Sequence, residues 1–233
     1  MKFRIYLFAL CILGAQSVVA QNEVALRGGG GGFSIGYANM DVSAFEEFIQ
    51  GEAKRFTNDQ LLFGGGGRSF IGNFIIGGSG QGLIGDTHTD DSLKMSLAGG
   101  MGTLDIGYLV YNREQLKIYP MLGLGGGGYE VQITQNENIS ADEVRQDPGR
   151  EITVGTGGFL ADISLNMNVL PIIEQSEDGS SYGGFSIGLS AGYTYGVRFS
   201  EWGFAGGDIS GGPDFNMDMF YVKVTIGGMG FEK

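Results

Sequence analysis

Residues 185–199 carry the pattern that most constrains the fold, an unbroken alternation with a period of two. Small or polar side chains occupy one parity of this segment. Large or apolar side chains occupy the other: Phe185, Ile187, Leu189, Ala191, Tyr193, Tyr195, Val197 and Phe199. This period is that of a β-strand with one apolar face. Strands of soluble proteins average about five or six residues, whereas a tilted membrane-spanning strand needs about 9–11. The length of the pattern therefore favours a strand that crosses a membrane.

Similar alternation recurs along the chain and predicts an all-β fold. Phe33, Ile35 and Tyr37 share one face of the opening segment, and Phe220, Val222 and their successors share one face near the end. Glycine runs at several places leave the facing of the intervening segments unassigned. Eight strands are expected, over residues 33–42, 60–71, 73–84, 94–112, 116–134, 152–170, 184–199 and 216–231.

The connections between these strands alternate in length. Short turns are expected around residues 72–73 and 112–115, and 171–183 is intermediate. The other connections are longer, and they cover residues 43–59, 85–93, 135–151 and 200–215. Outer-membrane barrels have short periplasmic turns and long extracellular loops. The alternation predicts an antiparallel up-and-down transmembrane β-barrel with both termini on the periplasmic side.

The first twenty residues have the features of a cleaved secretory signal. Lys2 and Arg4 precede an apolar run, and Val18 and Ala20 place small residues before a cut at Gln21. Cys11 lies inside the apolar run and not at the cut, so lipidation is not expected. The predicted organisation is a signal peptide over 1–20, a glycine-rich lead over 21–32 and one barrel domain over 33–233.

Composition excludes several classes of protein. The chain has 45 glycines with 16 Phe and 10 Tyr, and such aromatic content is not typical of disordered glycine-rich chains. Its net charge of −12 repels nucleic acid, so no nucleic-acid partner is expected. Because residues after 20 contain no apolar run long enough for a spanning helix, any membrane crossing requires a closed barrel.

On strand count, alternation and loop asymmetry, the chain resembles the small eight-stranded outer-membrane barrels of the OmpA/OmpX type over roughly residues 33–231. The resemblance rests on architecture and not on a residue signature. It implies insertion in the outer membrane after Sec-type export, contact with its lipid and lipopolysaccharide, and a monomer. Barrels of this type normally end on an aromatic residue, whereas Phe231 is followed by Glu232 and Lys233.

Polar side chains on the small parity form a candidate interior cluster. Charges that face lipid at mid-depth are costly, so these residues should point into the barrel and pair there. The cluster comprises Asp162, Asn166, Asn168, Arg198 and Lys223, with Arg68, Asp105 and Glu130 as further members. An eight-stranded barrel has room for side chains or one small ligand. The cluster therefore fits structural ion pairs, or else a narrow pore or ligand pocket.

Two long loops carry candidate surface contacts. Residues 43–59 have a helical pattern, with Ser43 and Glu46 spaced as a capping box. Phe45 and Phe48 would lie on one side of this short helix, and Trp202 and Phe204 lie in the last long loop. These aromatic residues are candidates for contact with an extracellular partner.

Residues suited to catalysis or metal binding are few. His88 with Asp90 or Ser92 could imitate the catalytic group of a lipid-modifying enzyme. Asp86, Asp90 and Asp91 could hold Ca²⁺, but their spacing does not match an EF-hand. The favoured interpretation of both is a solvated polar loop, and neither a cofactor nor a metal is expected.

The sequence favours a non-enzymatic outer-membrane barrel that acts structurally, in adhesion or in surface interaction. A narrow pore or small-ligand barrel is one alternative. A soluble exported barrel like a lipocalin, periplasmic or secreted, is another, and an enzyme using His88 is a third. The lipocalin alternative differs in a testable way, because its apolar faces would point into a core.

Overall fold

The computed structural model describes residues 26–43, 57–89, 93–135, 151–199, 201–204, 207–209 and 216–232. Its long strands are β1 (Arg27–Met40), β2 (Asp59–Ile71), β3 (Phe74–Thr89), β4 (Leu93–Tyr108), β6 (Leu116–Gln135), β7 (Glu151–Val169), β9 (Ser181–Phe199) and β12 (Met219–Glu232). Four two-residue strands complete the described part: β5 (Tyr111–Asn112), β8 (Glu174–Gln175), β10 (Gly203–Phe204) and β11 (Gly207–Asp208). No helix among the described residues is long and apolar enough to cross a membrane. Most of the predicted loop helix, including Phe45 and Phe48, lies outside the described residues.

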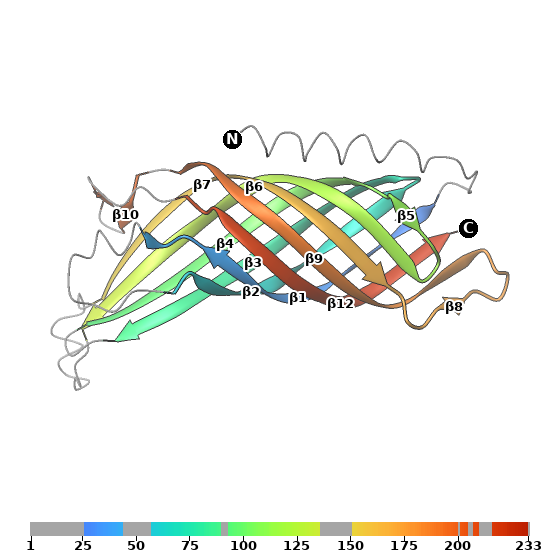
Figure 1. The fold of residues 1–233 in the computed structure, drawn as a ribbon, viewed down its shortest axis with the longest axis horizontal. Coiled ribbons are helices and arrows are strands. Elements are labelled where there is room, and N and C mark those ends of the chain that lie inside the picture. The colour runs from blue at the N-terminus through green and yellow to red at the C-terminus, as the bar shows by residue number, and fades with distance from the viewer. Residues whose placement is uncertain are drawn as a thin grey trace.

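The eight long strands close into one antiparallel barrel (Figure 1). Each pairs with the next long strand in sequence, and β1 pairs with β12 from Arg27↔Glu232 to Met40↔Met219. Arg27 and Glu232 therefore lie together, at the end of the barrel that carries the short turns. The predicted eight-stranded up-and-down barrel is confirmed.

The apolar parity of the strands faces outward. Phe33, Leu104 and Phe159 are 60%, 78% and 72% exposed, while their neighbours Ser34 and Leu160 are buried inside. A continuous exposed apolar surface of this kind is suited to lipid and not to water. The protein is accordingly an outer-membrane β-barrel. The lipocalin alternative is wrong, because it requires these side chains to point into a core.

Two strands extend well beyond the prediction, and the strand expected over 94–112 ends at Tyr108, with Tyr111–Asn112 forming β5. The glycines at 28–32 are part of β1 and not a lead before it, since they pair with both β2 and β12. Residues 85–89 continue β3, and β4 begins at Leu93, so the connection expected over 85–93 shrinks to 90–92. Both segments have the glycine-rich or polar composition that is typical of loops. They form strands because the backbones of the neighbouring strands supply hydrogen-bonding partners.

Glycines form a belt across the lipid-facing wall. The strand register places Gly31 opposite Gly67, Gly80 opposite Gly102, and Gly102 opposite Gly126. The outward glycines of this belt are Gly228 and Gly230 (β12), Gly29 and Gly31 (β1), Gly65 and Gly67 (β2), Gly78, Gly80 and Gly82 (β3), Gly100 and Gly102 (β4), Gly126 and Gly128 (β6), and Gly155 and Gly157 (β7). The glycine runs of the sequence are thus stacked side by side by strand pairing.

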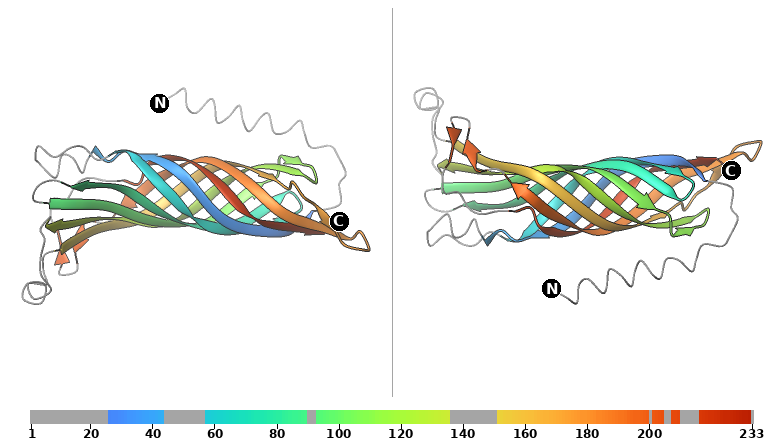
Figure 2. Two further views of the ribbon diagram at one scale, coloured as in Figure 1. Left: turned by 90° about the horizontal axis from the view of Figure 1, so that it is seen from below. Right: turned by 90° about the horizontal axis from the view of Figure 1, so that it is seen from above.

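Strands β3, β4, β6 and β7 project beyond the rest of the barrel at the loop end (Figure 2). Pairing of β2 with β3 stops at Leu61↔Ile84, and pairing of β9 with β7 stops at Phe199↔Gly158. Beyond these points β3, β4, β6 and β7 continue to pair with one another as far as Thr89 and Glu151. We call this four-stranded extension the projecting sheet.

Candidate functional site

The barrel interior is filled in three layers. An apolar cluster closes the loop end, and it includes Met40, Leu97, Trp202 and Met217. A second apolar cluster closes the turn end: Leu26, Phe70, Ile75, Leu109, Tyr119, Met121, Leu170, Tyr182, Met229 and Phe231. Six members of the predicted polar cluster lie between them: Arg68, Asp105, Asp162, Asn166, Asn168 and Lys223. Their polar atoms are therefore separated from both mouths of the barrel by packed apolar side chains.

Asp162 and Asn166 are held mainly by uncharged partners. Thr194 Oγ1 donates to Asp162 Oδ2 at 3.0 Å, and the Tyr221 hydroxyl donates to Asp162 Oδ1 at 3.1 Å. Ser190 Oγ donates to Asn166 Oδ1 at 2.7 Å. Neutral hydroxyls thus satisfy a carboxylate that was expected to be paired with a cation.

Arg68 belongs to a second chain of hydrogen bonds in the same layer. Its guanidinium donates to the Tyr119 hydroxyl, and that hydroxyl donates to Asn168 Oδ1. The Arg68 guanidinium also lies 5.3 Å from the centroid of the Tyr119 ring. Tyr119 therefore links two of the predicted cluster residues, although the sequence did not single it out.

Asp105 and Lys223 line a small cavity with Arg68 and Asp162. Its volume is about 30 Å³, which is about the room that one water molecule occupies. Two acidic and two basic side chains share this cavity, so its formal charge balances. A space of this size is a small interior cavity between packed side chains.

Two predicted members of the interior cluster differ from the others. Glu130 is exposed on the outer wall, because β6 runs without a bulge past its glycines and Tyr129 takes the inward position. The expectation that Glu130 faces inward is wrong. Arg198 lies beside a register shift between β7 and β9, and its side chain is outside the described part.

A buried lysine anchors the turn end. Lys117 is fully buried, and its Nζ donates to the carbonyl oxygens of Arg113 (3.2 Å) and Glu114 (3.4 Å) and to the Tyr182 hydroxyl (3.3 Å). The same Nζ lies 4.2 Å from the centroid of the Phe231 ring. Sequence reasoning missed Lys117, because the facing of β6 could not be assigned beside its glycine run.

A larger pocket, which we call the outer pocket, opens on the outside of the barrel wall near its loop end. Its volume is about 990 Å³. Residues of β4, β6 and β7 form its floor and the segment through β10 forms its edge: Ala98, Gly99, Gly100, Gly128, Tyr129, Glu130, Thr153, Gly155, Thr156, Gly157, Glu201, Gly203 and Phe204. Its floor is mostly glycine because the glycine belt ends here, so bound groups can approach the sheet backbone.

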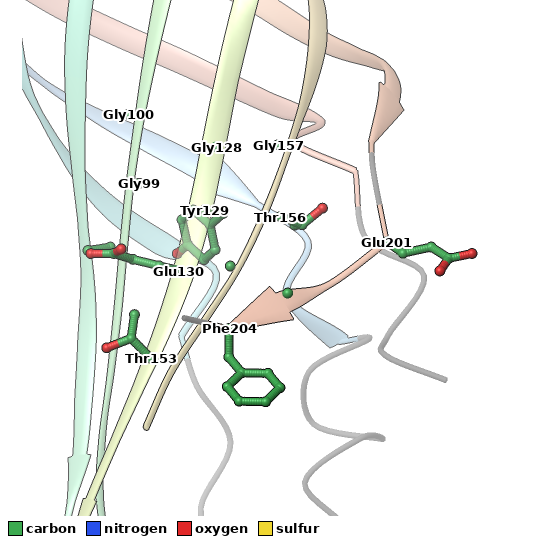
Figure 3. Close-up of a pocket in the computed structure, with 13 residues that line it drawn as sticks. Gly99, Gly100, Gly128, Tyr129, Glu130, Thr153, Thr156, Gly157, Glu201 and Phe204 are labelled. Atoms are coloured by element: carbon green, nitrogen blue, oxygen red, sulfur yellow. The ribbon is translucent and has the colours of Figure 1, made fainter. Parts of the chain in front are cut away.

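The charged and aromatic residues of the outer pocket are spread across it. In the view of Figure 3, Glu130 and Glu201 lie on opposite sides, with Phe204 between them. Strand β10 holds Phe204 here by pairing with β7 at Gly203↔Gly155 and Phe204↔Val154. Among the described residues that line the pocket, none is basic. The pocket is therefore acidic, with a flat floor and one accessible aromatic ring.

The two aromatic residues predicted for the last long loop differ in their exposure. Trp202 is only 5% exposed and packs in the loop-end apolar cluster, so it closes the mouth and does not face a partner. Phe204, two residues later, is 47% exposed and lines the outer pocket. Trp202 is therefore buried in the barrel, whereas surface contact by Phe204 stays a prediction.

The remaining chemical candidates fall largely outside the described part. Asp90, Asp91 and Ser92, with the side chains of Asp86 and His88, lie outside the described part. Within the described ranges, no group of three or more His, Cys, Asp or Glu side chains is arranged to hold a metal ion.

No protein-family model and no curated protein matches the sequence. Among solved structures, the barrel is similar to Ail, the attachment invasion locus protein of Yersinia pestis, with 10% identity, a TM-score of 0.46 and coverage of 90% of this chain and 99% of Ail. A structure of Ail with the heparin analogue sucrose octasulfate matches with 16% identity, a TM-score of 0.42 and coverage of 87% and 98%. A major outer membrane protein from Thermus thermophilus matches with 10% identity, a TM-score of 0.34 and coverage of 87% and 99%.

Proposed function

We propose that this protein is a non-enzymatic surface-interaction protein of the outer membrane, and that its loop end makes the interaction. The projecting sheet is the observation that carries the proposal. It extends past the point where the other four long strands stop, so it places ordered backbone beyond the lipid-facing wall.

The outer face of the projecting sheet is polar, unlike the wall below it. Thr87, Thr89 and Lys94 are exposed there, and Ser96 Oγ donates to Gln132 Oε1 at 3.3 Å. The opposite face packs Met95, Leu97 and Val131 into the loop-end apolar cluster. One face of this sheet is held by packing in the apolar cluster, and the other face is open to water. Such an arrangement suits contact with a partner outside the cell.

The edge of the projecting sheet also supports the proposal. No described strand pairs with β3 beyond Ile84 on its β2 side. In that stretch β3 is an edge strand of the projecting sheet, and edge strands can pair with a strand from another chain. Packed side chains in the interior also favour this role over transport, because the cavity that Arg68, Asp105, Asp162 and Lys223 line has a volume of only about 30 Å³.

Adhesion of bacterial cells tests the proposal. We compare cells that produce the wild-type protein with cells that produce T87K/T89K, on surfaces coated with whole serum or with collagen. Lysines on an edge strand oppose strand addition, so we expect adhesion to decrease toward the level of cells without the protein. Q175K/S180K, which adds the same charges at the turn end, is the matched control. Equal adhesion with and without the protein would contradict the proposal.

A further inference from the structure

We propose that the outer pocket binds an aliphatic chain that carries two separated positive charges, as ammonium or guanidinium groups. The inference deepens the proposed surface role and rests on it, because the pocket lies at the same end of the barrel. The charge, shape and aromatic lining of the pocket each support it.

The charge of the pocket lining determines the sign of the charge that the ligand carries. The only charged side chains among the described residues lining the pocket are the carboxylates of Glu130 and Glu201. The whole chain adds a net charge of −12, so the surrounding field also attracts cations. Phosphate, sulfate and acidic sugars would meet two carboxylates with no compensating cation among the described lining residues. The described lining therefore favours cations over anions.

The positions of the two carboxylates determine the number of positive charges on the ligand. Glu130 is on β6, whereas Glu201 precedes β10, and the two lie on opposite sides of the pocket (Figure 3). In that view the two carboxylates point away from each other, so one ammonium group is not placed to contact both. A ligand with a cation at each end of a flexible linker suits this arrangement, and both ion pairs would then form together.

The floor and the aromatic ring suit the linker between the charges. Gly100, Gly128 and Gly157 present backbone without side chains, so a methylene chain can lie flat along the sheet. Phe204 is exposed beside this floor, and the face of an aromatic ring attracts cations as well as methylene groups. The volume of about 990 Å³ is at the upper end for small-molecule sites and admits an extended chain.

Two sources could supply this chemistry, and calorimetry separates them. The full chain, folded in non-ionic detergent micelles, is titrated with spermidine and with a capped Lys-Gly-Gly-Lys peptide. Saturable binding of spermidine alone assigns a free polyamine, and tighter binding of the peptide assigns a basic segment of another protein. Butylamine, which has one charge, should bind more weakly than either.

Variants locate the binding. Exposed charge pairs and cation–π contacts each contribute modestly, so E130Q, E201Q and F204L should each weaken binding about two- to fivefold. E130Q/E201Q should weaken it by about tenfold or more, and E174Q/E177Q at the turn end should leave it unchanged. The fluorescence of Trp202, the single tryptophan, reports locally because it lies between Glu201 and Gly203. A mobility shift on boiling verifies that each variant is folded.

Two results would overturn the inference: no saturable binding of either probe, or equal loss in E130Q/E201Q and E174Q/E177Q. The second would mean that only the general negative field attracts cations. These failures differ from failure of the proposed function. If titration is negative while T87K/T89K reduces adhesion, the surface role stands and only this ligand class is wrong.

Discussion

Individual glycines in this barrel have unequal structural roles. A Cβ atom built at Gly125, on the inward parity of β6, would lie 1.9 Å from the carbonyl oxygen of Gly102 on β4. Backbone cannot swing aside as a side chain can. At Gly80, which faces lipid, a Cβ atom would meet no other atom within 4 Å. Glycine is therefore required at position 125, where β4 and β6 approach closely, and is replaceable at position 80, where the wall is open.

The substitutions Gly125→Ala and Gly80→Ala test this difference. Gly125→Ala should destabilise the barrel by about 1–3 kcal/mol, the usual cost of forcing an extra carbon into a packed site. Gly80→Ala should be neutral or slightly stabilising, because alanine restricts the unfolded chain. Urea unfolding in detergent, followed by gel mobility, measures both. Equal stability of the two variants would show that the close approach of β4 and β6 is not a constraint.

Asp178 organises the turn between β8 and β9 through hydrogen bonds to its carboxylate. Ser176 Oγ donates to Oδ1 at 2.6 Å, and Ser180 donates through its amide (3.0 Å) and its hydroxyl (2.8 Å). These bonds, with that from Ser176 the largest cause, lower the pKa of Asp178 from 3.8 to about 2. Because the folded pKa is the lower one, the stabilisation is complete above pH 3.8 and is lost as the pH falls toward 2.

Nuclear magnetic resonance titration of the Asp178 carboxyl carbon should accordingly give a midpoint near pH 2. The protection of the Ser180 amide from exchange, relative to an unstructured peptide at the same pH, should fall over the same range. The substitution Asp178→Asn should remove the pH dependence of this turn, while Glu177→Asn, its exposed neighbour, should preserve it. A midpoint for Asp178 near 3.8 would contradict the hydrogen-bonded turn.

At the scale of the element, β12 shows how register determines the role of a residue. Pairing with β1 and β9 runs without interruption from Met219 to Glu232. Phe231 therefore shares the inward parity of Tyr221 and packs at the turn end, where its ring stacks on Tyr182 at 5.3 Å. The terminal aromatic residue, with Lys117 above its face, closes the barrel from inside.

Replacing Phe231 by alanine should cost about 3–5 kcal/mol, as for other buried aromatic residues. Ile226→Ala on the lipid face of the same strand is the control, and its effect should be smaller because lipid replaces the lost contacts. Thermal unfolding, measured by loss of the gel mobility shift, compares the two variants. A larger effect at Ile226 would show that lipid contact contributes more than the interior plug.

At the scale of the whole molecule, closure at both ends separates this barrel from an open pore. Apolar clusters fill the loop end and the turn end, and the charged layer between them has its own partners. The interior charges, which in sequence fit structural ion pairs or a narrow pore, thus form a packed polar layer between two apolar clusters once the strands close.

Planar bilayers containing the purified, folded protein should consequently show no steady conductance. The substitution Trp202→Ala, which thins the loop-end cluster, should produce brief openings at most, because the turn-end cluster remains. Stable single-channel steps from the wild-type protein would contradict the sealed interior and would favour the narrow-pore alternative.

The sequence alone determined the strands with strict alternation, because the identity of each side chain reveals its face when large and small residues alternate. Strands β7, β9 and β12 followed from this rule, as did the placement of Asp162, Asn166, Asn168 and Lys223 on the face opposite the apolar side chains. It could not determine direction, since the same alternation suits an apolar core or an apolar exterior.

Tertiary structure decided the facing and the boundaries of the strand segments that contain glycine runs. Glycine has no side chain to mark its face, so only pairing with neighbouring strands placed residues 28–32 inside β1 and turned Glu130 outward. Likewise, the sequence does not distinguish Trp202 from Phe204, since both are aromatic residues of the same loop. Only the closed barrel buries Trp202 in the loop-end apolar cluster and leaves Phe204 exposed. The outer pocket exists for the same reason, because it joins residues of β4, β6, β7 and β10 that only barrel closure brings together.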